Sequence, residues 1–161
     1  MRKGWSALLL SAVCLLAACR PQQEAVGASS AAPDQDSAAA AALEESGYAV
    51  WREILPDPGY FLTGERCRLV LNGDQDVEIF LYLYGTPEEA PADAGCISPD
   101  GFSFSRPGSQ EGTMDGASID WISVPHFYLY NRAIVQYVGT DPQILSVLEA
   151  LCGAPFAGGE T

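Results

Sequence analysis

The chain has 161 residues, of which 48% are hydrophobic and 18% are charged, and its formal net charge at pH 7 is −13. This length supports one small hydrophobic core rather than two full domains. No lysine follows Lys3 and His126 is the single histidine, which excludes a Schiff-base lysine, a phosphate-loop lysine and any multi-histidine metal site.

The first nineteen residues have the pattern of a secretion signal. Arg2 and Lys3 give a positive start, residues 4–13 are mostly apolar, and small residues precede Cys19. The apolar run is shorter than the roughly 20 residues that cross a bilayer, and no second run of that length follows. The sequence therefore predicts a signal peptide over residues 1–18 and no permanent transmembrane helix.

The motif Leu-Ala-Ala-Cys at residues 16–19 resembles the lipobox of bacterial lipoproteins. The resemblance covers residues 1–19 alone. It implies cleavage before Cys19 and a diacylglycerol on its thiol, which would anchor the protein in a bacterial membrane. Because Arg20 and not an acid follows the cysteine, the resemblance implies the outer membrane, facing the periplasm, in a host that has one. An ordinary secretory signal cut nearby is the alternative.

The charge of the mature chain restricts its partners. Removal of residues 1–18 leaves six arginines against 21 acids, a net charge of −15. This charge excludes nucleic-acid binding. It would steer a basic protein toward the surface, and it also serves simply to keep the protein soluble.

Composition divides the mature chain into three parts. Residues 19–47 are rich in Ala, Ser, Gln and Pro and predict a lipid-anchored flexible tether that spans roughly 30 Å. The alanine run at 38–42 favours a helix within part of it. Residues 48–156 form a single domain, and residues 157–161 form a tail.

The first half of the domain predicts a helix, a hairpin and a second helix. The helix covers residues 48–55 and ends at Pro56. Alternating apolar residues then predict two strands around a turn of about five residues that begins at Asn72-Gly73. In this register Leu71, Leu69 and Cys67 lie opposite Val77, Ile79 and Leu81. A short helix follows from Thr86, with Pro87 in its first turn, to about residue 94.

The second half predicts mostly strands. A short strand at 102–104 precedes a Gly- and Ser-rich loop of 13 residues, 106–118. Three further strands cover 119–124, 127–130 and 133–138, and a final helix begins at Thr140-Asp141 and ends at Gly153. The segment 131–141 resembles segments of small bacterial envelope proteins, and this resemblance implies no activity.

This order of elements predicts an α+β domain. We expect a small, mostly antiparallel sheet of about five to six strands, with the C-terminal helix packed on one face.

No arrangement of residues predicts catalysis or a metal site. Asp120 and Ser123 point to opposite faces of a strand, and Pro125 separates them from His126, so a hydrolase triad is not expected. A Cys96 nucleophile with His126 as base is also disfavoured, because exported cysteines are commonly oxidised. The acidic turn after Asn72 begins like a calcium loop but lacks its glycine and final glutamate. The sequence predicts no cofactor.

Three cysteines follow the acylated one, an odd number for an oxidising compartment. A structural bridge between Cys67 and Cys96 closes the shorter loop and is the preferred pairing, with Cys152 as the alternative partner.

The tyrosines and phenylalanines of the predicted strands suggest a surface for recognition. The residues that share a strand face with other aromatic residues are Phe80, Tyr82, Tyr84, Tyr128, Tyr130 and Tyr137. They predict either a platform for a glycan or a peptide, or one side of a core that a second layer, from Tyr48 and Trp51 to Phe61, covers.

Three functions remain open at this point. The leading hypothesis is a non-catalytic cell-envelope lipoprotein that presents a small acidic module, which binds a protein or a cell-wall component. The alternative is a periplasmic inhibitor of a cationic wall hydrolase such as lysozyme, which the charge favours by analogy only. The third hypothesis, an enzyme, has no supporting arrangement of residues.

Overall fold

The computed structural model describes residues 35–56 and 61–159, which belong to the compact unit Ala31–Thr161. The predicted signal peptide, Cys19 and most of the predicted tether lie outside the described residues. In chain order the elements are α1 (Gln35–Glu45), β1 (Val50–Ile54), β2 (Glu65–Leu71), β3 (Asp74–Leu83), α2 (Glu89–Ala94), β4 (Ser103–Pro107), β5 (Met114–Ser118), β6 (Pro125–Tyr130), β7 (Ala133–Val138), α3 (Pro142–Cys152) and β8 (Ala157–Gly158).

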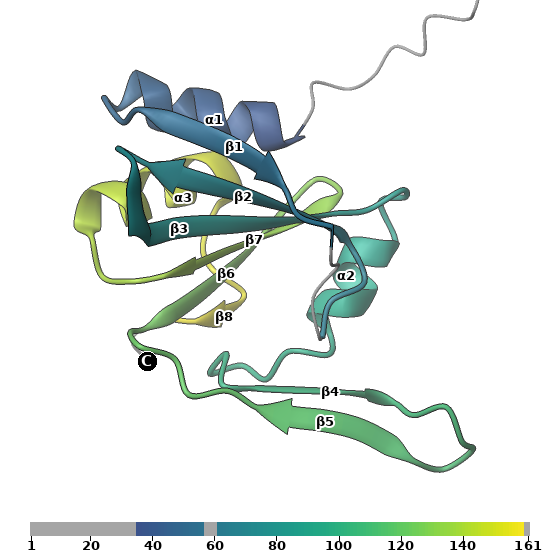
Figure 1. Cartoon of the computed structure of the whole chain (residues 1–161). Coiled ribbons are helices and arrows are strands. Elements are labelled where there is room, and N and C mark those ends of the chain that lie inside the picture. The colour runs from purple at the N-terminus through teal and green to yellow at the C-terminus, as the bar shows by residue number, and fades with distance from the viewer. Residues whose placement is uncertain (1–34, 57–60, 160–161) are drawn as a thin grey trace, which may run out of the picture. The chain divides into compact units, whose positions relative to one another are not determined.

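Six of the strands form one antiparallel sheet in the order β1-β2-β3-β7-β6-β8 (Figure 1). The remaining two strands, β4 and β5, pair with each other in a separate two-stranded arm. The predicted α+β class, the antiparallel sheet and the packing of the C-terminal helix on one face are confirmed. None of the described helices is both long and apolar enough to cross a membrane.

Two helices, α1 and α3, cover one face of the sheet, which we call the helix face. Ala39 and Leu43 of α1 and Ile144 and Leu148 of α3 are fully buried there. The residues of α1 lie four apart, so that they share one side of the helix. The predicted domain start at residue 48 therefore falls inside the compact unit, and α1 belongs to the core rather than to the tether.

The opposite face of the sheet, which we call the arm face, lies beneath α2, the start of the β4–β5 arm and Leu62. Its buried residues include Ala90 and Ala94 of α2, Phe104 of β4 and Phe127 of β6. The two faces give the domain a three-layer arrangement, because side chains of successive strand residues point to opposite sides.

The final helix forms as its sequence predicts. Asp141 caps it, because its carboxylate accepts hydrogen bonds from the backbone N–H groups of Gln143, at 2.8 Å, and Ile144, at 3.4 Å. Pro142 occupies the first turn, where no intrahelical donor is needed. Gly153, with a φ of 83°, ends the helix.

The β2–β3 hairpin confirms most of the predicted register. Cys67 pairs with Leu81 and Leu69 with Ile79, but Leu71 pairs with Asp74 instead of Val77. Asn72 and Gly73 both have positive φ, 55° and 73°, which is the geometry of a two-residue hairpin turn. The predicted five-residue turn was wrong because a register shift between Val70 and Leu71 absorbs the extra residues.

The segment 48–55 is not the predicted helix but contains strand β1. Its residues pair in continuous register with β2, from Val50 with Leu71 to Ile54 with Cys67. β-branched Val50 and Ile54 suit a strand, and the free edge of β2 satisfies their backbone groups. Pairing with a distant segment therefore outweighs the local pattern.

The segment 102–124 also differs from expectation. The predicted loop 106–118 is largely ordered as the β4–β5 arm, and no strand forms at 119–124. Gly116 makes the arm possible: a Cβ at this position would lie 2.9 Å from the Phe104 carbonyl oxygen. The second helix starts at Glu89 rather than near Thr86, whose backbone N–H donates to the Glu89 carboxylate at 3.1 Å.

Candidate functional site

The aromatic residues predicted as one binding face divide between the two faces of the sheet. Tyr137 pairs with Ile79 and Tyr128 with Val135, so these tyrosines lie on the helix face, fully or almost fully buried. Tyr130 packs against the same cluster. Phe80, Tyr82 and Tyr84 lie on the arm face. A single platform of six aromatic residues is therefore contradicted.

A covering layer buries the inner part of the arm face. Tyr82 and Tyr84 are only 9% and 7% exposed, because Leu62, α2 and Phe104 lie over them. A second layer therefore covers these two tyrosines, but it comes from other residues than predicted, and the Trp51 side chain is 61% exposed. Tyr48 packs on the helix face instead.

A buried polar cluster holds the covering layer in place. The Asp93 carboxylate of α2 accepts hydrogen bonds from the Tyr84 hydroxyl, at 2.9 Å, and from the Thr63 hydroxyl, also at 2.9 Å. Arg106 of β4 lies 3.5 Å from the same carboxylate. Burial, and then the charge of Asp93, raise the pKa of Tyr84, so the hydroxyl remains a donor. The cluster connects four segments of the chain.

A groove on the arm face, beside the covering layer, has a cavity of about 200 Å³. Its floor is the sheet, and its walls come from the segment before β2, from β4 and from the segment after β5. The lining residues are Phe61, Leu62, Arg66, Phe80, Tyr82, Phe104, Ile119, Trp121 and Gln136. We call this site the aromatic groove.

The walls of the aromatic groove are stacked rings. Phe61 stacks on Phe104, with ring centroids 4.8 Å apart, and Trp121 packs edge-on against Phe127. The Trp121 indole N–H donates to the Gly101 carbonyl at 2.8 Å, which fixes the ring. These flat surfaces are suited to hold another ring or a large apolar side chain.

Arg66 sets the charge of the aromatic groove. Its guanidinium lies 5.5 Å from the centre of the Phe80 ring, within the range of a cation–π interaction. Within residues 35–56 and 61–159, its buried Nε–H has no hydrogen-bond acceptor and no carboxylate forms an ion pair with it. None of the described residues that line the groove is acidic.

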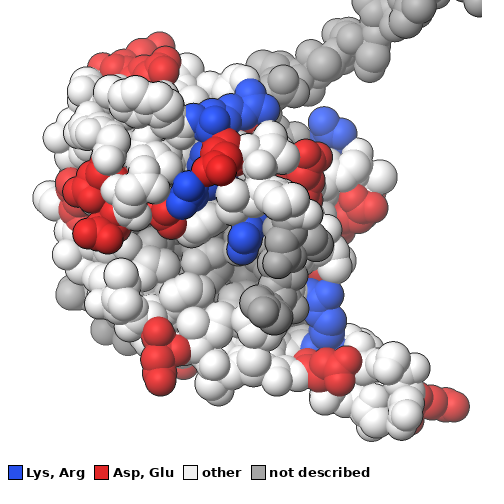
Figure 2. Space-filling view, in the orientation of Figure 1, with Lys and Arg blue, Asp and Glu red and all other residues white. Residues whose placement is uncertain are grey.

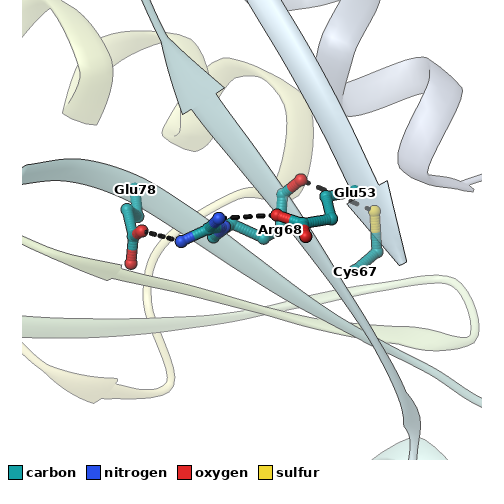
Figure 3. Close-up of polar contacts among 4 residues, drawn as sticks. All are labelled: Glu53, Cys67, Arg68 and Glu78. Atoms are coloured by element: carbon teal, nitrogen blue, oxygen red, sulfur yellow. Dashed lines mark hydrogen bonds and ion pairs between the residues drawn. The ribbon is translucent and has the colours of Figure 1, made fainter. Parts of the chain in front are cut away.

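Three other arginines of the domain, Arg52, Arg68 and Arg106, have carboxylate partners. Arg52 pairs with the buried Asp36. Arg68 connects three strands, since its guanidinium lies 2.5 Å from Glu53 of β1 and 2.6 Å from Glu78 of β3 (Figure 3). Figure 2 shows separate acidic patches and a few basic side chains on the face in view. Arg66 and Arg132 have no carboxylate partner among the described residues, and of these two only Arg66 lines the aromatic groove.

The floor of the aromatic groove contains two polar side chains, those of Tyr82 and Gln136. The Tyr82 hydroxyl donates to Gln136 Oε1 at 3.0 Å. Burial raises the pKa of the Tyr82 hydroxyl, and the nearby positive charge of Arg66 offsets part of that rise. Gln136 also carries two amide N–H donors. The floor thus presents donors between aromatic rings.

A second cavity, of about 450 Å³, lies beside the exposed Trp51 on the β1–β2 side. Its lining includes Glu53 and Arg68, whose charges pair with each other. It therefore offers one exposed ring and neutralised charges, and we regard the aromatic groove as the better candidate.

The structure does not assemble the catalytic arrangements that the sequence disfavours. Asp120 is exposed, while His126 is buried and lies 3.1 Å from the Gly139 carbonyl oxygen. Within the described ranges, no hydrogen bond joins His126 to Asp120, Ser123 or Cys96. In the same part of the chain, no group of three or more His, Cys, Asp or Glu side chains could hold a metal ion.

The environment of His126 predicts a dependence of stability on pH. Burial lowers its pKa, and the Gly139 carbonyl and the charge of Glu149 offset only part of this. Because the folded state binds the proton less readily than the unfolded chain, the unfolding free energy should fall as the pH drops below about 7. Urea midpoints at pH 7.5 and 5.5 should differ less in His126→Gln than in the unchanged chain. Equal differences would show that His126 titrates normally.

The predicted bridge between Cys67 and Cys96 is not formed in the structure, in which Cys67, Cys96 and Cys152 are free. Cys67 is buried on the helix face, where its thiol donates to the backbone carbonyl of Arg68 at 4.0 Å (Figure 3). Cys96 follows α2, which packs on the arm face. Cys152 lies at the edge of the helix-face core, and burial raises its pKa to about 12.

Comparison with known proteins finds no matching family model, no similar curated protein and no similar solved structure. The function is therefore inferred from the geometry of the described residues. Sequence reasoning identified Phe80 and Tyr82 but missed Arg66, Trp121 and Gln136. The alternation of the β2–β3 hairpin does place Arg66 on the face of Phe80 and Tyr82, and this signal could have connected them.

Proposed function

We propose that the protein is a non-catalytic lipoprotein of the bacterial cell envelope that binds a protein or a cell-wall component through the aromatic groove. Cys19 carries the lipid anchor, and the module faces the periplasm from the outer membrane in a host that has one. The observation that supports binding is the groove itself: aromatic walls around a cation that no described carboxylate neutralises.

Two physical arguments favour a ligand at this place. Aromatic rings supply large contact areas with little loss of conformational entropy. A guanidinium that no described carboxylate neutralises can form charge-assisted hydrogen bonds with an anionic ligand. The alternative, an inhibitor of a basic hydrolase, draws no comparable support, since the acidic residues on the face that Figure 2 shows lie in separate patches.

The anchor is tested by a substitution at Cys19. Because the thiol is the lipid acceptor in the proposed class, Cys19→Ser should prevent incorporation of labelled fatty acid and release the chain from the detergent-extracted membrane fraction. Cys14→Ser, within the signal, is the matched control and should change neither property. A Cys19→Ser chain that is still labelled and still fractionates with membranes would refute the anchor.

The binding role is tested by comparing what the full-length chain retains from envelope extracts. Phe80→Ala removes a ring from the groove floor and should abolish retention of the specific component. Trp51→Ala removes an exposed ring beside the second cavity and should leave retention unchanged. Unfolding midpoints of both variants check that they fold. If Trp51→Ala loses retention and Phe80→Ala keeps it, the binding site lies on the β1–β2 side and not in the aromatic groove.

A further inference from the structure

The proposed binding function leads to a narrower inference about the ligand, which rests on it. We infer that the aromatic groove takes the carboxyl-terminal end of a polypeptide whose last side chain is aromatic or large and aliphatic. The terminal carboxylate would lie at Arg66, and the last side chain would lie between the aromatic walls.

The size of the aromatic groove limits the ligand to about one large side chain. Its cavity is about 200 Å³, below the roughly 300–1,000 Å³ of pockets that enclose drug-sized molecules. The stacked pair of Phe61 and Phe104 and the ring of Trp121 give the walls flat apolar surfaces. A ring or a branched aliphatic side chain fits such walls better than a polar one.

Charge complementarity selects a carboxylate. Among the described residues that line the groove, Arg66 is the single cation and none is acidic. No described carboxylate forms an ion pair with Arg66, and a carboxylate can accept two parallel hydrogen bonds from a guanidinium. Elsewhere the acidic surface repels anions, so an anionic ligand is favoured at this point of the domain in particular.

The Gln136 amide beside Arg66 favours the carboxyl-terminal end of a peptide over an internal segment. An internal aromatic or aliphatic residue has carbonyl acceptors but no charge of its own to match Arg66. A terminal residue has both a carboxylate beside its side chain and a preceding carbonyl, which the amide N–H groups of Gln136 can bind while Gln136 Oε1 accepts from Tyr82. The ligand therefore uses the ring surfaces, the cation and the floor amide together.

The inference is tested with defined peptides and the full-length chain. The probes are acetyl-Ala-Ala-Ala-Phe with a free carboxylate, the same peptide with a carboxyl-terminal amide, and acetyl-Ala-Ala-Ala-Ala with a free carboxylate. Each carries a fluorophore on its amino-terminal side, and anisotropy gives the dissociation constant. The first peptide should bind at least about tenfold more tightly than either of the others, because only it satisfies both Arg66 and the walls.

Two arginine variants provide the matched comparison. Arg66→Gln should remove the preference for the free carboxylate over the amide. Arg132→Gln should retain it, since Arg132 also lacks a carboxylate partner within the described ranges but donates to the Gly85 carbonyl outside the groove. If Arg66→Gln fails to fold, Arg66→Lys keeps the charge without the bidentate geometry and should reduce the preference.

The outcomes separate this inference from the proposed function. Equal binding of the acid and the amide would overturn the role of the carboxylate. Failure of all three peptides, while retention from envelope extracts still depends on Phe80, would overturn the peptide-end inference and leave the binding function standing. If phenylpropionate binds as tightly as the first peptide, the inferred ligand would be a small aromatic acid and not the end of a polypeptide.

Discussion

Replacement of Tyr82 and Tyr84 together by alanine is expected to lower the unfolding free energy by more than about 3 kcal/mol. Both rings lie beneath the covering layer, and neither is more than 9% exposed. Loss of the Tyr84 hydroxyl also removes one donor to Asp93, which connects α2 to Thr63 and Arg106. Urea denaturation of the double variant measures the effect.

The control for this prediction is Trp51→Ala, since the Trp51 ring is 61% exposed on the edge strand β1. This change should alter the unfolding free energy by less than about 0.5 kcal/mol. A double tyrosine variant as stable as the unchanged chain would mean that the two rings face solvent. The arm face would then be an open aromatic platform, and the groove would not have the boundaries described.

A second large effect is expected at α1. Leu43→Ala should lower the unfolding free energy by about 2–5 kcal/mol, because Leu43 is fully buried between the sheet and α3. Chemical denaturation again measures it. Glu44→Ala, at the exposed neighbouring position, is the matched control and should have little effect. If Leu43→Ala has no effect either, α1 is detached and the tether extends to residue 47.

The ion pair between Asp36 and Arg52 also indicates that α1 is part of the folded domain. Asp36 is 1% exposed and lies on the first turn of the helix, while Arg52 belongs to β1. A buried carboxylate requires a partner, so the pair fixes the position of α1 against the edge of the sheet. A chain shortened to begin at residue 48 would lose this contact and the buried side of α1, and would expose the helix face.

Local signals in the sequence predicted those elements whose ends are determined by nearby residues. The cap at Asp141, the stop at Gly153 and the Asn72-Gly73 turn all act within a few residues, and α3 and the β2–β3 hairpin form where they indicate. The fold class follows from the order of such elements. The edge strand β1 could not be predicted in this way, because its partner β2 decides its conformation.

The candidate site was harder to predict for the same reason. The alternation of strand residues identified Phe80 and Tyr82 as neighbours but could not show which rings a second layer covers. The walls of the groove come from positions 61, 104 and 121, which are far apart in the chain. Contacts at such separation depend on the packing of α2 and the β4–β5 arm, and neither follows from local patterns.

One measurement tests the central claim, that the domain is a binding module that acts through the aromatic groove. A photoreactive phenylalanine analogue is placed at Ile119, which lines the groove, or at Glu44, which is exposed on α1 over the opposite face of the sheet. The full-length chain is irradiated in living cells. The account predicts a discrete adduct from position 119 and none from position 44. No adduct from position 119, or the same adducts from both positions, would contradict it.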